Sequence, residues 1–179
     1  MSDHSEGPRA VIVGPPGAGK TTVGELLAAR IDVPFRDVDH DIERIAGKSV
    51  SDIFTTDGEP AFRALEEQAV AAALTDHAGV LALGGGAVLS ERTRALLLTP
   101  TVVFLSVGMA EGMRRTGLST ARPLLAGVNP RATFKALLDE RLPLYREVAT
   151  VEVATDELNP EEIVAAVLDR LGSPTRSPN

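Results

Sequence analysis

The sequence predicts an α/β protein of three layers, α/β/α, with helices on both faces of a five-stranded parallel sheet. Short apolar runs alternate with helical patterns along the whole chain, which favours parallel strands joined by helices. A glycine-rich segment, residues 14–22, links the first apolar run to the first helical pattern, and loops of this kind hold phosphate groups. The five expected strands comprise residues 10–13, 33–38, 80–83, 102–105 and 151–153.

The overall composition is that of a single globular domain, which we expect to span residues 1–179. The net charge of -7 disfavours a nucleic acid partner, because duplex binding depends on neutralising phosphates. No cysteine is present, which excludes disulfides and thiolate metal sites. The amino-terminal residues lack the apolar core of a signal peptide and no run reaches the length of a membrane span. We therefore expect a cytoplasmic protein without a membrane partner.

The glycine-rich loop has the spacing G-x-x-x-x-G-K-[ST], with Lys20 and Thr21 in its last two positions. Its glycines let backbone amides surround phosphate oxygens, the lysine supplies a mobile positive charge, and the threonine hydroxyl can bind Mg2+. An accidental glycine turn is the alternative, but the apolar strand before the loop and the helix after it favour a nucleoside triphosphate site. The expected phosphate-binding residues are Gly17, Ala18, Gly19, Lys20, Thr21 and Thr22.

Two carboxylates, Asp37 and Asp39, lie at the end of the second expected strand. Side chains two positions apart on a strand point to the same side, and ligands of such sheets bind at the carboxyl ends of the strands. The pair therefore suggests a metal ligand and a group that accepts the proton of an incoming hydroxyl. The alternative for Asp39 is a helix cap, with the helix beginning at His40.

A long insertion, about residues 39–79, separates the second and third expected strands and should contain more than one helix. Gly47 can end the first of these helices and Ser51 can cap the second. Residues 55–60, rich in turn-forming side chains, should connect the second helix to the third.

Three further features lie in the second half of the chain. Residues 117–130, which include Arg122, have the length and composition of a mobile lid. The last helix should begin after an Asn159 cap and end at Gly172. The polar tail, residues 173–179, is expected to be disordered.

A glycine triplet, Gly84, Gly85 and Gly86, follows the third expected strand. Three glycines leave backbone amides open to a closely approaching group. A tight strand-to-helix turn, which is the alternative, needs only one or two. We therefore expect a ligand to contact this turn.

Three arginines, Arg63, Arg122 and Arg141, indicate an anionic ligand, because guanidinium groups bind carboxylate or phosphate in a bidentate manner. For Arg63 the alternative is an ion pair with Glu66 or Glu67, one turn further along its helix.

Arg141 falls on the apolar stripe of its helix, where a charge needs a partner. Pro143 cannot extend regular helical hydrogen bonding, so the helix should kink or end near Arg141 and aim its guanidinium inward. The alternative is a structural ion pair, for example with Glu66 or Asp139.

Together these motifs resemble those of the shikimate kinase family, and the resemblance covers nearly the whole chain. It rests on the loop at residues 14–21, Asp37-Val38-Asp39, Phe62-Arg63 followed by Glu66, Gly84-Gly85-Gly86-Ala87, Arg122-Pro123-Leu124-Leu125, and Arg141-x-Pro143-Leu144-Tyr145. The loop alone indicates only a phosphate-binding protein, whereas the later motifs in this order are far more specific.

The resemblance implies a P-loop kinase fold like that of nucleoside monophosphate kinases. It implies transfer of the γ-phosphoryl group of ATP to the 3-hydroxyl of shikimate, with Mg2+, on the pathway to aromatic amino acids. We expect the enzyme to be a monomer. A gluconate kinase or a nucleoside monophosphate kinase would use the same loop. A nucleotide-dependent switch is a further alternative, but it would explain neither the acid nor the arginines.

The resemblance also implies roles for single residues. Lys20 and Arg122 would meet the transferred phosphoryl group, Thr21 and Asp37 would hold Mg2+, and Asp39 would act as the base. The shikimate-binding residues would be Asp39, Arg63, Gly84, Gly85, Gly86 and Arg141, and the residues against adenine Arg115, Asn159 and Pro160. Where the family carries a basic residue just before Asn-Pro, this chain has Glu157-Leu158.

Overall fold

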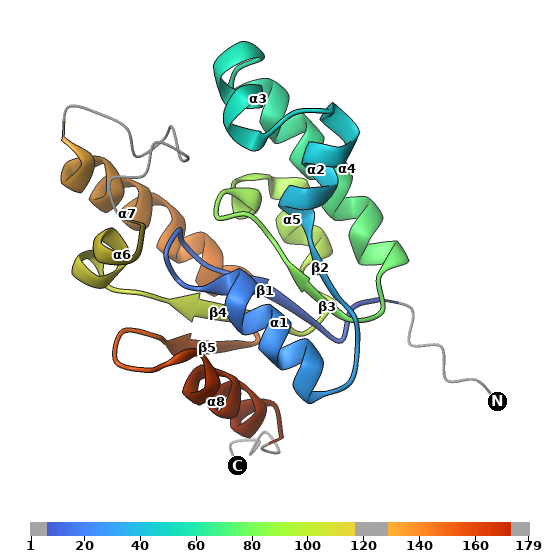
Figure 1. Ribbon diagram of the computed structural model, residues 1–179, viewed down its shortest axis with the longest axis vertical. Coiled ribbons are helices and arrows are strands. Elements are labelled where there is room, and N and C mark those ends of the chain that lie inside the picture. Colours follow the sequence, from blue (N-terminus) through green and yellow to red (C-terminus); the bar gives the residue numbers. More distant parts are fainter. Residues whose placement is uncertain (1–6, 117–128, 173–179) are drawn as a thin grey trace.

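A parallel sheet of five strands forms the centre of the protein in the computed structural model, which describes residues 7–116 and 129–172 (Figure 1). The strand order is β2-β3-β1-β4-β5. The strands are β1 (Ala10–Val13), β2 (Phe35–Asp37), β3 (Val80–Ala82), β4 (Val102–Ser106) and β5 (Val151–Ala154). All five predicted strands are therefore confirmed, and β1, buried along its whole length, lies in the middle.

Helices cover both faces of this sheet, which confirms the predicted three layers (Figure 1). On β1, Val11 and Val13 pack towards α4 and α7, while Ala10 and Ile12 pack towards α1 and α8. Alternate residues of a strand face opposite sides, so a central parallel strand is apolar throughout. The helices are α1 (Lys20–Arg30), α2 (Val38–Ala46), α3 (Val50–Thr56), α4 (Glu59–Asp76), α5 (Glu91–Leu96), α6 (Met109–Thr116), α7 (Pro130–Val148) and α8 (Pro160–Gly172), with a short 3-10 helix η1 (Ala87–Leu89).

The insertion contains three helices, α2 to α4, and the structure corrects two of its predicted boundaries. Gly47 ends α2 with a φ of 72°, as predicted. The cap of α3 is Ser49, whose hydroxyl accepts from the backbone of Asp52 at 3.1 Å, and not Ser51. The predicted turn over residues 55–60 is also too long, because α3 continues to Thr56 and α4 begins at Glu59.

Helix α7 continues through Pro143 to Val148, so of the two predicted outcomes, a kink or an end of the helix near Arg141, the end is wrong. Buried side chains on both sides of the proline, among them Phe134 and Tyr145, hold the helix against its neighbours. This packing outweighs the hydrogen bond that the proline cannot donate.

Helix α8 begins with a reciprocal pair of capping contacts. The Asn159 side chain accepts from the backbone of Glu162 at 2.9 Å, and the Glu162 side chain accepts from the backbone of Asn159 at 3.1 Å. The helix ends at Gly172, as predicted. Arg122, nearly all of the expected lid and the tail at 173–179 lie outside the described residues. Within the described ranges, no helix has both the length and the apolar character needed to cross a bilayer.

Gly112 permits the close packing of α6 on α7. A Cβ atom added there would lie 2.6 Å from Cζ of Phe134, a ring that is fully buried. We predict that Gly112→Ala lowers the free energy of unfolding by about 1–3 kcal/mol, because overpacking outweighs the better helix propensity of alanine. Urea denaturation measures this change. Gly172→Ala is the control, since among the described residues no atom outside its own helix backbone and its chain neighbours lies within 4 Å of its added Cβ. An unchanged midpoint for Gly112→Ala would contradict the prediction.

Candidate active site

The phosphate loop leads directly from β1 into the first turn of α1. Gly19 adopts a left-handed conformation with a φ of 85°, and the helix begins at Lys20. The Lys20 ammonium donates to the carbonyl of Pro15 at 3.1 Å, which folds the side chain back over the loop. No acidic residue lies in the first turn of α1. The unpaired amides and positive dipole end of the helix are therefore available to an anion.

The loop borders a cavity of about 350 Å³ that it shares with the second and third strand ends. The residues that line it include Gly17, Gly19, Lys20, Thr21, Thr22, Asp37, Asp39, Gly84, Gly85 and Arg115. The structure thus brings together most of the residues that the sequence singled out. Ala18 is fully buried behind the loop and does not line this cavity.

Asp37 connects the loop to α2 through both of its carboxylate oxygens. Oδ2 accepts from the Thr21 hydroxyl at 3.0 Å, and Oδ1 accepts from the backbone of Asp39 at 2.9 Å. Asp37 is therefore the cap of α2, which begins at Val38, and the alternative that Asp39 caps a helix from His40 is wrong. The prediction that Asp37 and Asp39 lie two positions apart on one strand is also wrong. Strand β2 ends at Asp37, and Asp39 reaches the cavity from α2.

The oxygen atoms of Thr21 and Asp37 suit Mg2+, which prefers hard oxygen ligands. Among the described residues, no group of three or more His, Cys, Asp or Glu side chains could hold a metal ion. A magnesium site with few protein ligands, completed by phosphate oxygens and water, fits this donor set.

The glycine triplet forms a turn that protein side chains approach closely. A Cβ atom on Gly84 would lie 2.9 Å from Oε2 of Glu66 and 3.0 Å from Oδ1 of Asp39. A Cβ atom on Gly86 would overlap the guanidinium of Arg63. Glycine thus lets these side chains lie close to the backbone, and together the contacts bring two acids and an arginine to one turn.

Tyr145 fixes the same turn from α7, because its hydroxyl donates to the carbonyl of Gly85 at 2.5 Å. Burial raises the pKa of this hydroxyl to about 12. The ring of Tyr145 stacks on Phe104 of β4, with centroids 5.0 Å apart. The sequence gives no local signal for this hydroxyl contact, because Tyr145 and Gly85 are 60 positions apart.

Arg141 lies one helical turn before Tyr145 and is 5% exposed. Its Nη1 atom comes within 3.5 Å of the position that a Cβ on Gly85 would take. Within the described part of the chain Arg141 forms no ion pair, whereas Glu66 pairs with Arg63 at 2.8 Å and Asp139 with Lys135 at 2.6 Å. The two carboxylates suggested as structural partners of Arg141 therefore pair with other residues. The buried guanidinium of Arg141 faces the glycine turn.

Glu66 is a buried carboxylate that the sequence suggested only as an ion-pair partner. Burial raises its pKa above 4.5, Arg63 lowers it in part, and the nearby charge of Asp39 raises it further. The spacing of Glu66 in α4 could have predicted that its carboxylate is buried, because Glu66 shares the buried face of the helix with Phe62 and Ala69. The alternative for Arg63 is thus partly correct, since this arginine pairs with Glu66 and with Glu59 but not with Glu67.

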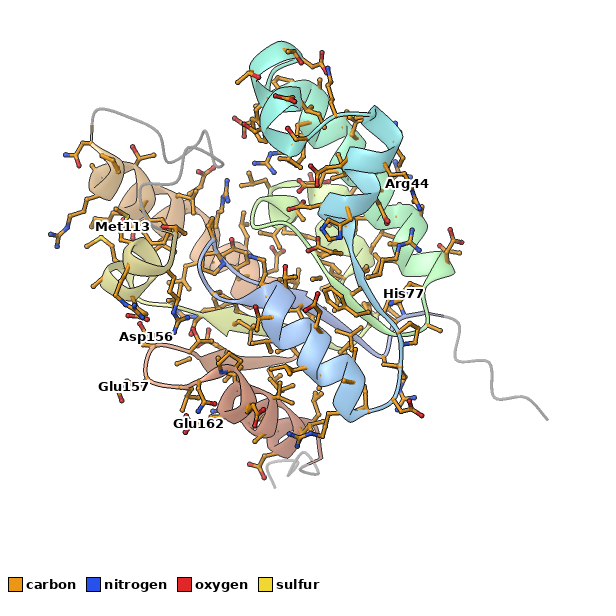
Figure 2. The ribbon with its side chains drawn as sticks, viewed as in Figure 1. Arg44, His77, Met113, Asp156, Glu157 and Glu162 are labelled. Atoms are coloured by element: carbon orange, nitrogen blue, oxygen red, sulfur yellow. The ribbon has the colours of Figure 1, made fainter. Side chains whose placement is uncertain are left out.

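A second cavity, of about 460 Å³, lies on the other side of the loop against the start of α8. Arg115 at its edge donates to the carbonyl of Gly17 at 3.2 Å and to the hydroxyl and carbonyl of Thr155 at 2.9 and 2.8 Å. Figure 2 shows Asp156 and Glu157 on the loop that precedes α8. The lining includes Ala18, Glu111, Arg114, Arg115, Asp156, Glu157, Leu158, Asn159 and Pro160.

Comparison with known proteins identifies the family. The sequence pattern of the family described as shikimate kinase matches residues 16–172, nearly the whole chain. The chain belongs to the shikimate kinase family. A shikimate kinase of Saccharopolyspora erythraea is 72% identical over 92% of this chain and 94% of its own.

Solved structures agree with this assignment. A shikimate kinase from Acinetobacter baumannii in complex with shikimate superposes with a TM-score of 0.91 at 36% identity, over 97% of each chain. A gluconokinase from Sinorhizobium meliloti reaches a TM-score of 0.53 at 21% identity over 93% of this chain and 92% of its own, which shows a shared fold only. The predicted P-loop kinase fold and shikimate kinase activity are therefore confirmed, and membership of the family implies the use of ATP.

The raised pKa of Glu66 gives a prediction for stability. Because the folded protein binds this proton more tightly than the unfolded chain, the associated stabilisation is fully present below about pH 4.5 and is lost as the pH rises through the folded pKa. We expect the free energy of unfolding of the native protein, relative to Glu66→Gln, to fall over this window. Urea denaturation from about pH 4.5 to about pH 8 measures it, and a rising difference would contradict the prediction.

Proposed function

We propose that the loop cavity holds the phosphates of ATP and that the neighbouring acids and glycine turn hold shikimate. The observation that best supports this proposal is that Lys20 and Asp39 line one cavity, which also reaches Gly84 and Gly85. A phosphoryl donor at the loop and a hydroxyl beside Asp39 would then lie next to each other. Proximity of this kind is the main contribution that proteins make to phosphoryl transfer.

On the donor side, we propose that the backbone amides at Gly17, Ala18, Gly19 and Thr22 and the Lys20 ammonium bind phosphate oxygens. Thr21 and Asp37 would hold Mg2+, which would neutralise charge on the phosphates when bound. Adenine would lie in the cavity between Arg115 and Asn159-Pro160, which is bordered by these residues. Glu157 and Leu158 border the same cavity, so adenine would pack there without the basic residue of the family.

On the acceptor side, we propose that Arg63 and Arg141 bind the carboxylate of shikimate beside Gly84, Gly85 and Gly86. Asp39 would orient the 3-hydroxyl and accept its proton. The hydroxyl oxygen forms the new bond to the γ-phosphorus while the bond to the bridging oxygen breaks, and ADP leaves with the electron pair. For Arg122 we propose contact with the transferred phosphoryl group, and for residues 117–130 a lid, on family resemblance alone.

We further propose that the chain works as a single domain and as a monomer in the cytoplasm. The site residues that the structure describes converge around one loop and one turn of a single chain, which supports this proposal. Light scattering after gel filtration tests the oligomeric state, and a dimer at assay concentration would contradict it.

A steady-state assay tests the acceptor. The enzyme is given ATP with shikimate, gluconate or AMP in separate reactions. We expect turnover with shikimate to exceed the other two, and phosphorus NMR of the product to identify the 3-phosphate. Faster turnover with gluconate or AMP would contradict the proposal, and phosphate on another hydroxyl would contradict the assigned position.

Replacing Asp39 tests the base. We expect Asp39→Asn to lower kcat by about 100-fold or more, because general base catalysis contributes about 10²–10⁴-fold. The Kd for ATP, measured by calorimetry, should stay near that of the native protein. Near-native kcat would show that Asp39 has only a structural role.

Replacing Arg141 tests the carboxylate site. We expect Arg141→Ala to weaken shikimate binding by about 2 kcal/mol or more, as when one partner of a buried charge pair is lost. Calorimetry with shikimate measures the change, and thermal unfolding checks that the variant folds. Unchanged affinity in a folded variant would favour a purely structural arginine.

A further inference from the structure

The guanidinium of Arg63 contacts two carboxylates of its own helix, α4, one on each of two edges. Nη1 donates to Glu66 at 2.8 Å, whereas Nε and Nη2 both donate to the same oxygen of Glu59, each at 3.3 Å. The Glu66 side chain is 4% exposed and that of Glu59 is 45% exposed. One contact is therefore short and buried, and the other is long and open to water.

The edge that Glu59 contacts is suited to a ligand carboxylate. The parallel N–H groups of Nε and Nη2 can bind both oxygens of one carboxylate, with distances of about 2.7–2.9 Å. Here the two groups share a single oxygen at 3.3 Å. The contact with Glu59 thus leaves this edge only partly satisfied, and a second carboxylate with better geometry can replace it.

Glu59 can leave Arg63 at little cost. It is the first residue of α4, after Gly58, and reaches Arg63 one turn further along the same helix. Its exposed carboxylate is solvated after release, and the positive end of the helix dipole stabilises its charge there. Glu66 cannot leave in the same way, because its buried carboxylate would lose its 2.8 Å partner.

We propose that Glu59 is an internal competitor for the carboxylate of shikimate, occupying the Nε–Nη2 edge of Arg63 until the substrate displaces it. This inference rests on the proposed role of Arg63 in binding that carboxylate. Glu59 sets the affinity for the acceptor through Arg63, while Glu66 keeps the guanidinium oriented in both states.

Glu59→Gln tests the competition. We expect the Kd and KM for shikimate to fall about two- to fivefold, because an exposed ion pair one helical turn apart contributes about 0.2–1 kcal/mol. The kcat and the KM for ATP should not change. Thermal unfolding confirms that the variant is folded.

Glu67→Gln is the matched control. Glu67 borders the same cavity as Glu59 and Arg63, but its described contacts are with Ser90 at 2.5 Å and Arg92 at 3.6 Å. The substitution Glu67→Gln removes an equal charge but no contact with Arg63. Equal tightening in both variants would mean a general electrostatic effect and would overturn the proposal, as would unchanged or weaker shikimate binding by Glu59→Gln.

An acceptor without the carboxylate separates this inference from the proposed function. With the carboxamide of shikimate, Glu59→Gln should give no gain in affinity, and a gain equal to that for shikimate would overturn the proposal. Arg63→Ala completes the set. If it leaves shikimate affinity unchanged, the proposed role of Arg63 fails. If it weakens binding while Glu59→Gln has no effect, only the competition fails.

Discussion

The carboxylate of Asp37 joins the two halves of the site. One oxygen accepts from the Thr21 hydroxyl at the start of α1, and the other accepts from the Asp39 backbone at the start of α2. The phosphate loop and Asp39 therefore share one anchor at the end of β2. Both helices begin at this carboxylate, so their amino-terminal dipoles favour negative charge in the same region.

The acceptor side concentrates charge in a buried region around the glycine turn. Asp39 and Glu66 approach Gly84, while Arg63 approaches Gly86 and Arg141 approaches Gly85. Burial of such groups costs stability unless they are paired and hydrogen-bonded. The arrangement balances two acids against two arginines around the glycine turn.

Local sequence patterns predicted the strands, the phosphate loop and the end of α2, because burial on both sides and a left-handed glycine leave clear signatures. They also drew attention to Arg141, since a charge on an apolar stripe is unusual. They placed the cap of α3 at Ser51 instead of Ser49, because either hydroxyl could serve. They could not foresee that α7 passes through Pro143, or that Tyr145 reaches Gly85 across 60 positions of sequence. These outcomes depend on packing between distant segments, which local propensity does not encode.

Helix α7 contacts both ends of the site. Near its start, Phe134 packs against Gly112 of α6, whose carbonyl lies beside the phosphate loop at Gly17. Near its end, it presents Arg141 and Tyr145 to the glycine turn. A substitution that shifts this helix would move the phosphate loop and the glycine turn at once. The buried face of α7 therefore couples two ends of the site that lie far apart in the sequence.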